Sequence, residues 1–262
     1  MDSIDTIRRE RTLKMRVEDF LLRQVRGTGV LSSVFSELAE NTESSFLFGG
    51  MVRDILSRER NEASYPRDWD IVVSRFTPRL MNLIEPHVRK QTRFGGLELL
   101  IDGQDVDIWS LDNTWAFREK YLGHAGFNEL PKTTFLNVQA IAVELSPVPL
   151  KIGKIFEHGF YDAFARKVID INLEENPFPG LCVLSALSNA ARLGFSLSAR
   201  LTDYILKYYS EINTDNLARY QRKHWGTVRY PSHVLDEWIH GIQMQHAESP
   251  RRPTRLNPSP VV

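Results

Sequence analysis

Residues 48–56 are Phe48-Gly49-Gly50-Met51-Val52-Arg53-Asp54-Ile55-Leu56, and a second segment, Asp68-Trp69-Asp70-Ile71-Val72-Val73, follows shortly after. A Gly-Gly turn between an apolar strand and a helix lets a triphosphate approach the backbone at the helix N-terminus, where N–H groups favour anions. Two aspartates one residue apart in a strand point to the same face, because side chains alternate along a strand. Paired carboxylates are typical ligands of Mg²⁺. Together the two segments predict phosphoryl or nucleotidyl transfer.

Each segment also has an ordinary structural interpretation, since Gly-Gly before a helix is usually a turn and Asp-x-Asp can be a solvated edge strand or a cap. Their order favours the functional interpretation, because the pattern predicts a strand at 45–48, a helix at 51–56 and a strand at 68–73. Further on, a hairpin is predicted from strands at 97–101 and 104–111 around an Asp102-Gly103 turn. This hairpin carries Asp105 and Asp107 on one face, so a third carboxylate can join the first two.

These residues resemble the class II polynucleotide nucleotidyltransferases, which are the tRNA CCA-adding enzymes and bacterial poly(A) polymerases. The head domain of that family carries Gly-Gly-x-Val-Arg-Asp followed by Asp-x-Asp, and both motifs are present, with extra residues at 59–65 between them. Phe94-Gly95-Gly96 and Val106-Asp107-Ile108 are similar to the strand pair that bears the third acidic residue, which favours Asp107 over Asp105. The segment 181–195, ending in Ala-Arg-Leu-Gly-Phe, is similar to the family's neck helix.

The resemblance implies an α+β fold, in which a polymerase-β-like nucleotidyltransferase head with a small mixed sheet is followed by a helical neck. The expected boundaries are N-terminal helices packed on the head at 1–44, the head at 45–150 and the neck at 151–247. Residues 248–262 are rich in Pro, Arg and Ser and are expected to be disordered. The implied activity is metal-dependent transfer of a nucleoside monophosphate from a triphosphate to an acceptor hydroxyl, with an RNA 3′ end as the acceptor.

The resemblance also assigns roles to the acidic residues. Asp68, Asp70 and Asp107 would be the catalytic carboxylates and would hold two Mg²⁺ ions, with Mn²⁺ as an alternative. Asp105 is the rival of Asp107 for the third position.

A second group of residues would bind the nucleotide. Gly49 and Gly50 would seat the β- and γ-phosphates, while Arg53 would supply positive charge as pyrophosphate leaves. Asp54 is expected to orient Arg53 or to cap locally. Asn137 belongs to the segment 133–142, which is similar to a family motif that holds the nucleotide sugar, although its charged residues are missing here.

The neck helix departs from the family in the residues that would select the base. The Asp and Arg that read the incoming base fall on Pro179 and Cys182, or on Asn176 and Pro179, depending on the alignment. Two further family arginines fall on Ser185 and Ser188. Because this face is small and nearly neutral, ordered selection of C and then A is not expected.

A basic and aromatic segment at 219–230 is a candidate surface for the acceptor strand. Arg222, Lys223 and Arg229 could neutralise phosphates, and Trp225 could stack on an unpaired base. The competing interpretation, which a mixed charge pattern favours, is a solvated helix end whose aromatic rings pack on the neck.

Composition sets the remaining bounds. The 262 residues carry 33 basic and 33 acidic side chains, so any contact with RNA must be local. The single cysteine, Cys182, excludes an intramolecular disulfide and is expected to be a buried small residue. The absence of a signal core or a long apolar run predicts a cytoplasmic protein without a membrane partner. The base, the acceptor and the oligomeric state stay open.

Two other classes of function are compatible with the sequence. One is a toxin or defence effector that uses the same chemistry to modify tRNA or a protein. The other is a catalytically decayed module that binds RNA or nucleotide. The intact carboxylates argue against decay, because clustered acidic residues without a metal repel one another and cost stability.

Overall fold

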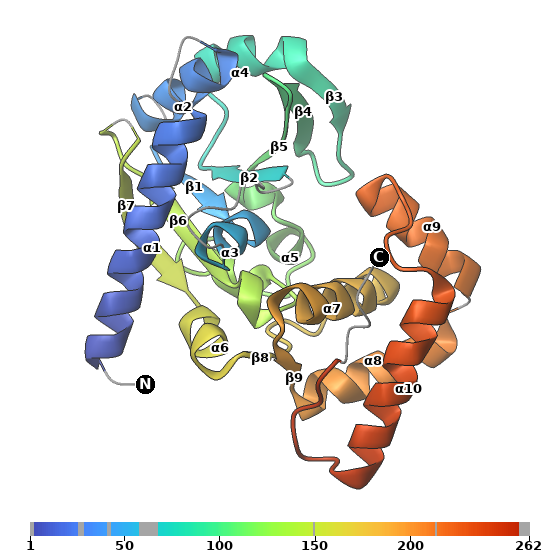
Figure 1. The fold of residues 1–262 in the computed structure, drawn as a ribbon. Helices are drawn as coiled ribbons and strands as arrows, with labels where there is room; N and C mark the ends of the chain where they lie inside the picture. Colours follow the sequence, from blue (N-terminus) through green and yellow to red (C-terminus); the bar gives the residue numbers. More distant parts are fainter. Residues whose placement is uncertain are drawn as a thin grey trace. The chain divides into compact units, whose positions relative to one another are not determined.

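A computed structural model describes residues 3–25, 29–40, 43–57, 68–148, 150–212 and 214–256. They form two units, each of which is described by itself. The sheet unit comprises the chain up to Thr134 together with Val138–Tyr161, and the helical unit comprises Phe135–Asn137 and the chain from Asp162 onward. Figure 1 shows the strands of the first unit and the C-terminal helices of the second.

Among the described residues of the sheet unit, seven strands form one sheet in the order β3-β4-β5-β2-β1-β6-β7. In this sheet β2 and β5 pair in parallel, and the other neighbouring strands pair antiparallel. The strands are β1 (Ser45–Phe48), β2 (Asp68–Val73), β3 (Val88–Gln91), β4 (Leu97–Ile101), β5 (Gln104–Ser110), β6 (Ile141–Leu145) and β7 (Ile152–Glu157).

Helices α1 (Ser3–Gln24) and α2 (Val30–Glu40) cover one face of this sheet. The indole of Trp69, in β2, is fully buried between Phe20 of α1 and Phe35 of α2, at centroid distances of 5.1 and 5.2 Å. Burying an aromatic side chain of this kind stabilises the fold by roughly 1.5–3 kcal/mol. Because Trp69 alternates with Asp68 and Asp70, the two helices cover the face opposite to the carboxylates.

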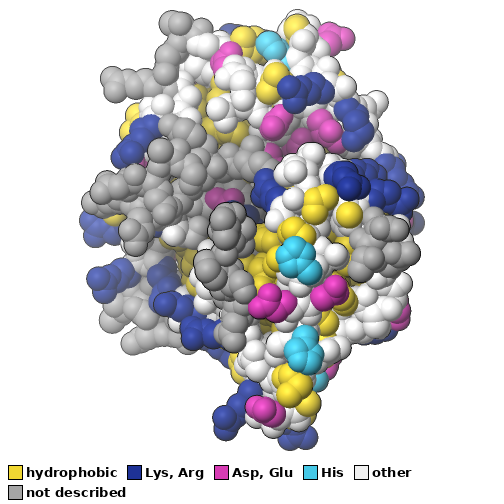
Figure 2. Space-filling view, turned by 45° about the vertical axis from the view of Figure 1, so that its right-hand side comes forward, with side chains coloured by type: hydrophobic (Ala, Val, Ile, Leu, Met, Phe, Trp, Pro, Cys, Tyr) yellow, Lys and Arg dark blue, Asp and Glu magenta, His cyan; other side chains and the backbone are white. Residues whose placement is uncertain are grey.

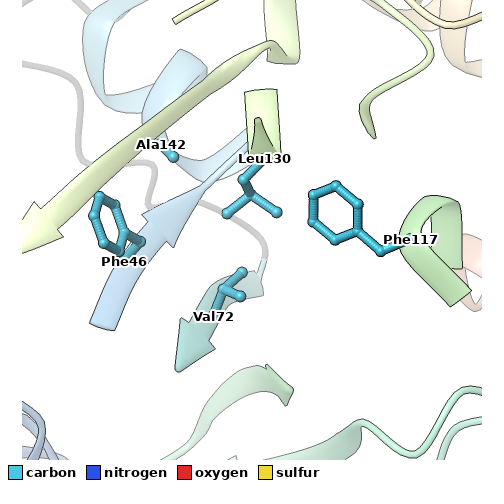
Figure 3. Packing of buried hydrophobic residues seen from close by; sticks show 5 residues of the cluster. All are labelled: Phe46, Val72, Phe117, Leu130 and Ala142. Atoms are coloured by element: carbon cyan, nitrogen blue, oxygen red, sulfur yellow. The ribbon is translucent and has the colours of Figure 1, made fainter. Parts of the chain in front are cut away.

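The carboxylate face is apolar at its other end. Figure 3 shows Phe46 of β1, Val72 of β2 and Ala142 of β6 meeting Phe117 and Leu130. Phe117 belongs to the short helix α5 (Trp115–Arg118), and Leu130 to the 3-10 turn η3 (Leu130–Thr133). This packing covers the sheet beyond Asp70 and leaves the acidic end at its border.

The two edge strands of the sheet are protected in different ways. In β3 all four side chains are exposed, and the pairing with β4 shifts register between Val88 and Lys90. Lys90 forms an ion pair with Glu98, and near the top of Figure 2 acidic and basic side chains lie side by side over this end of the sheet. At β7, by contrast, Glu18 of α1 accepts hydrogen bonds from the Ile152 N–H at 3.4 Å and from Lys151 Nζ at 2.8 Å.

The helical unit follows from α6 (Phe160–Arg166), which crosses the boundary between the units. Helix α7 (Pro179–Leu193) ends where Gly194 adopts φ +64°, a left-handed C-cap that glycine accommodates without a steric cost. Helix α8 (Ala199–Glu211) is capped by Ser198, whose hydroxyl accepts from the Leu201 N–H. The elements are β8 (Val168–Ile169), α7 (Pro179–Leu193), β9 (Ser196–Leu197), α8 (Ala199–Glu211), α9 (Thr214–Trp225) and α10 (Ser232–Glu248). The helices are interrupted at Gly194, between α7 and α8, and at Gly226 and Pro231, between α9 and α10.

Helix α4 (Pro78–Ile84) gives way to a 3-10 turn, η1 (Glu85–His87), at Pro86, which lacks an N–H. One expectation differs from the structure. Disorder predicted from residue 248 onward is wrong for residues 249–256. Thr254 is buried and exchanges backbone hydrogen bonds of 2.7 and 2.9 Å with Leu197.

The insertion at 59–65 and the end of the tail at 257–262 lie outside the described residues. Within the described part of the chain, no helix has both the length and the hydrophobicity of a membrane span.

Candidate active site

The Gly-Gly turn connects β1 to the helix α3 (Gly50–Ser57). Gly49 adopts φ +67°, a left-handed conformation, and its N–H donates to the Ile141 carbonyl at 3.0 Å. A Cβ atom at Gly49 would lie 3.9 Å from Asp70 Oδ2, and one at Gly50 would lie 3.3 Å from Arg53 Nη2. The turn therefore brings a carboxylate and a guanidinium to the N-terminal end of α3, with no side chain of its own in between.

Arg53 is held in place by its neighbour in the sequence. Its Nε donates to Asp54 Oδ1 at 2.7 Å, and the exposed fractions of the two residues are 6% and 8%. A charge-assisted hydrogen bond in a buried location fixes the guanidinium with little loss to solvent screening. The expectation that Asp54 orients Arg53 is confirmed.

The aspartates of β2 and β5 lie side by side. In the parallel register Asp68 pairs with Asp105, and Asp70 with Asp107, so all four side chains point to one face. Asp68, Asp70 and Asp107 are half-buried, whereas Asp105 is exposed and forms an ion pair with Arg89 at 3.0 Å. The strand pairing thus places the three carboxylates that the sequence singled out on one face of two neighbouring strands.

Carboxylate oxygens on neighbouring strands have the donor chemistry that Mg²⁺ prefers. In the described part of the chain, no three Asp, Glu, His or Cys side chains are gathered closely enough to form a metal site by themselves. The fit to a divalent cation therefore depends on donor chemistry and strand register.

Gln139 lies beside the Gly-Gly turn, and sequence reasoning missed it. Its Nε2 would be 3.6 Å from a Cβ at Gly50, and its carbonyl oxygen 3.9 Å from one at Gly49. The sequence offers no local signal for it, because Gln139 reaches the turn only through the pairing of β6, two residues further on, with β1.

Asn137 belongs to the other unit. Its side chain accepts from the Asp170 N–H at 3.0 Å and donates to the Val168 carbonyl at 3.4 Å, so it joins the segment 135–137 to β8. Its expected contact with the nucleotide stays a prediction.

The basic and aromatic segment lies on the helical unit, at the end of α9 and in the loop after it. Arg222, Lys223 and Arg229 are exposed, and the Arg229 guanidinium lies 5.2 Å from the Trp225 ring centroid. Figure 2 shows Lys and Arg side chains gathered where α9 comes forward. Gln221, 1% exposed, anchors the loop through hydrogen bonds with the backbone of Arg229 and Tyr230.

Along α7 the positions that would read the base are small or buried. Cys182 is 4% exposed, as predicted, and burial raises the pKa of its thiol to about 12. Ser188 Oγ lies 3.3 Å from the Tyr230 hydroxyl, and Ser185 Oγ accepts from the Asn189 amide at 3.3 Å. No charged side chain occurs on this helix before Arg192.

No protein-family profile and no characterised protein sequence matches the chain. Several solved structures are similar to it in fold. The Thermotoga maritima CCA-adding enzyme complexed with tRNA has a TM-score of 0.55 at 18% identity, over 88% of this chain and 53% of that one. A CCA-adding enzyme with CTP gives 0.54 at 17% identity, over 88% and 54%.

A tRNA-processing enzyme in an apo form gives a TM-score of 0.53 at 20% identity, over 85% of this chain and 57% of that one. The chain therefore spans just over half the length of these structures. At such low identity the likeness concerns the fold alone. The predicted α+β fold, with a mixed sheet followed by helices, is confirmed.

Proposed function

We propose that the chain is a metal-dependent nucleotidyltransferase that transfers a nucleoside monophosphate from a triphosphate to an acceptor hydroxyl, with an RNA 3′ end as the acceptor. The observation that carries this proposal is the parallel pairing of Asp70 with Asp107 next to the bare turn at Gly49. A seat for phosphates and a carboxylate pair on adjacent strands are the two parts that such a reaction needs.

Asp68, Asp70 and Asp107 would hold Mg²⁺, in a two-ion arrangement that also admits Mn²⁺. When bound, the ions would supply charge neutralisation at the phosphates and activation of the attacking hydroxyl. We assign the third position to Asp107, because Asp105 is exposed and already paired with Arg89.

The chain's own groups would position the triphosphate. The backbone of Gly49 and Gly50 would face the β- and γ-phosphates, with Arg53 and the Gln139 amide beside them. The acceptor oxygen would form a bond to the α-phosphorus while the bond from that phosphorus to the bridging oxygen breaks, and pyrophosphate leaves. Positive charge on Arg53 would stabilise the departing pyrophosphate.

Two observations support RNA as the acceptor. Structures of similar fold were determined with CTP, with ATP and with tRNA. The helical unit presents Arg222, Lys223 and Arg229 around Trp225, a combination that suits phosphates and unpaired bases. Because α7 lacks charged groups at the base-reading positions, we expect loose base selection and no ordered C-C-A product.

The test is incubation of the purified chain with labelled nucleoside triphosphates, Mg²⁺ and total cellular RNA. Asp70→Asn and Asp107→Asn should each reduce transfer by about a hundredfold or more, while Asp105→Asn, the matched control on the same strand, should retain most of it. Labelling of a protein or of one internal tRNA position would favour the effector class. Triphosphate binding without transfer would favour the decayed module.

The acceptor surface on α9 has a separate test. Replacing Arg222, Lys223 and Arg229 together with Ala should weaken RNA binding and lower the slope of its salt dependence by about 0.7 per lost contact. Trp225→Ala tests stacking. Unchanged affinity in both variants would return this segment to an ordinary solvated surface.

A further inference from the structure

Two arginines, one in the turn between β3 and β4 and one in α5, lie next to the aromatic ring of Phe94. The guanidinium carbon of Arg93 lies 5.5 Å from the ring centroid of Phe94, and that of Arg118 lies 6.0 Å from it. Among the described residues, neither arginine forms an ion pair, unlike the nearby Arg89 and Lys90. We call Arg93, Phe94 and Arg118 the arginine-phenylalanine cluster. Because an anion between two neighbouring positive charges is attracted by both, the cluster has the composition of an anion-binding site.

The cluster is held by backbone hydrogen bonds. The Thr92 N–H donates to the Gly96 carbonyl at 2.8 Å, and Thr92 Oγ1 accepts from the Gly96 N–H at 2.9 Å. Gly95 takes φ +86°, which closes the turn. Arg118, from α5, donates to the Phe94 carbonyl at 2.8 Å and so joins the helix to the turn. A ligand would meet groups that are already arranged, which lowers the entropy cost of binding.

The cluster lies on the same side of the sheet as the carboxylates. Arg118 directly follows Phe117, which belongs to the apolar cluster that Phe46 and Val72 form on the carboxylate face. In the antiparallel pair, Glu98 lies opposite Asp107, and the turn ends at Gly96, two residues along the strand. At 3.4 Å per residue the turn is about 7 Å along the strand from Asp107.

We propose that the arginine-phenylalanine cluster binds the single-stranded end of the RNA acceptor next to the reaction site. Arg93 and Arg118 hold backbone phosphates through guanidinium hydrogen bonds, and Phe94 provides a stacking surface for a base. The Tyr121 ring, three residues after Arg118, is 47% exposed and lies 5.5 Å from the ring of Trp115 in α5. The inference rests on the proposed function, to which it adds a binding site for the acceptor in the sheet unit.

The experiment measures binding of a fluorescein-labelled single-stranded RNA dodecamer by anisotropy over a salt series. Arg93→Gln with Arg118→Gln should weaken binding about tenfold and reduce the slope of log K against log salt by about 1.4, at 0.7 per phosphate contact. Phe94→Leu should weaken binding about tenfold without changing the slope. The matched control is Arg23→Gln with Arg75→Gln, which removes two exposed sheet-unit arginines paired with Asp19 and Glu43.

Unchanged RNA affinity in the cluster variants, equal weakening in the control, or no RNA binding by the wild type would each overturn the inference. The same holds if heparin binding falls as much as RNA binding while Phe94→Leu has no effect, because the cluster would then bind polyanions without bases. Transfer that depends on Asp70, measured in parallel, reports on the proposed function separately. The inference fails alone if transfer occurs and the cluster variants bind RNA normally.

Discussion

Replacing Gly49 or Gly50 with Ala separates two roles of the Gly-Gly turn. The left-handed backbone at Gly49 should affect stability, and the surface without side chains at Gly50 should affect triphosphate binding. Gly49 has φ +67°, and the left-handed conformation costs an L-residue roughly 1–2 kcal/mol. A Cβ there would lie 3.9 Å from its nearest neighbours, which is ordinary contact and adds no clash. Gly49→Ala should therefore lower the free energy of unfolding by about 1–2 kcal/mol, or the melting temperature by about 2–8 °C.

Gly50→Ala should leave the stability nearly unchanged and weaken triphosphate binding. Gly50 starts a helix, where Ala is favoured over Gly, and its Cβ would need Arg53 Nη2, 3.3 Å away, to move by a few tenths of an ångström. Stability should stay within about 0.5 kcal/mol. The methyl group would occupy the surface that the phosphates approach, so triphosphate affinity should fall by roughly tenfold or more.

Gly103→Ala is the matched control, because Gly103 has φ +81° in the β4–β5 turn and no atom within 4 Å of its Cβ position. It should lose as much stability as Gly49→Ala and bind triphosphate normally. The assays are thermal unfolding and calorimetric titration with a non-hydrolysable triphosphate in Mg²⁺. A Gly50→Ala protein with wild-type triphosphate affinity would refute the phosphate seat, and a Gly49→Ala protein of unchanged stability would refute the backbone argument.

Three further predictions concern stability. Phe46→Ala should cost about 3–5 kcal/mol in urea unfolding, because Phe46 is 2% exposed within the apolar cluster, whereas Phe178→Ala, at 42% exposure, should cost less than about 0.5. Cys182 should resist iodoacetamide at pH 8.5 until urea unfolds the chain, since burial raises its pKa from 9.0 to about 12. Rapid labelling of the native protein would contradict the burial of this thiol. The contribution of the neutral thiol to the free energy of unfolding should be complete below pH 9 and decline from there towards pH 12. Gln221→Ala should cost about 1–3 kcal/mol and Gln221→Glu less, because Glu keeps the acceptor for the Arg229 and Tyr230 N–H groups; the reverse order in thermal unfolding would contradict this anchor.

Much of the sheet unit was predictable from local patterns. The strand at 45–48, the helix after Gly50 and the strand at 68–73 follow from apolar periodicity and glycine position, and all three are confirmed. What local patterns could not supply is the pairing of β2 with β5 in parallel, because strand partners depend on the whole sheet. The side-by-side arrangement of Asp70 and Asp107 therefore had to come from the structure.

The missed residues have a similar explanation. Gln139 has no distinctive sequence context, and it reaches the Gly-Gly turn only because β6 pairs with β1. Composition misled at 249–256, where Pro and Arg predicted disorder but Thr254 completes hydrogen bonds with β9. The convergence of Arg93 and Arg118 on Phe94 joins residues from a turn and a later helix, so spacing gives no indication of it.

The different protection of the two sheet edges bears on aggregation. Strand β3 is exposed, but its register shift and the charges of Arg89 and Lys90 oppose docking by a second molecule. Strand β7 carries the exposed Lys154 and Glu157, and the start of its edge is covered by Glu18 of α1, which accepts from the Ile152 N–H. A chain shortened by removal of α1 would thus carry an open strand, and would be expected to self-associate through β7 even if the remaining sheet folded correctly.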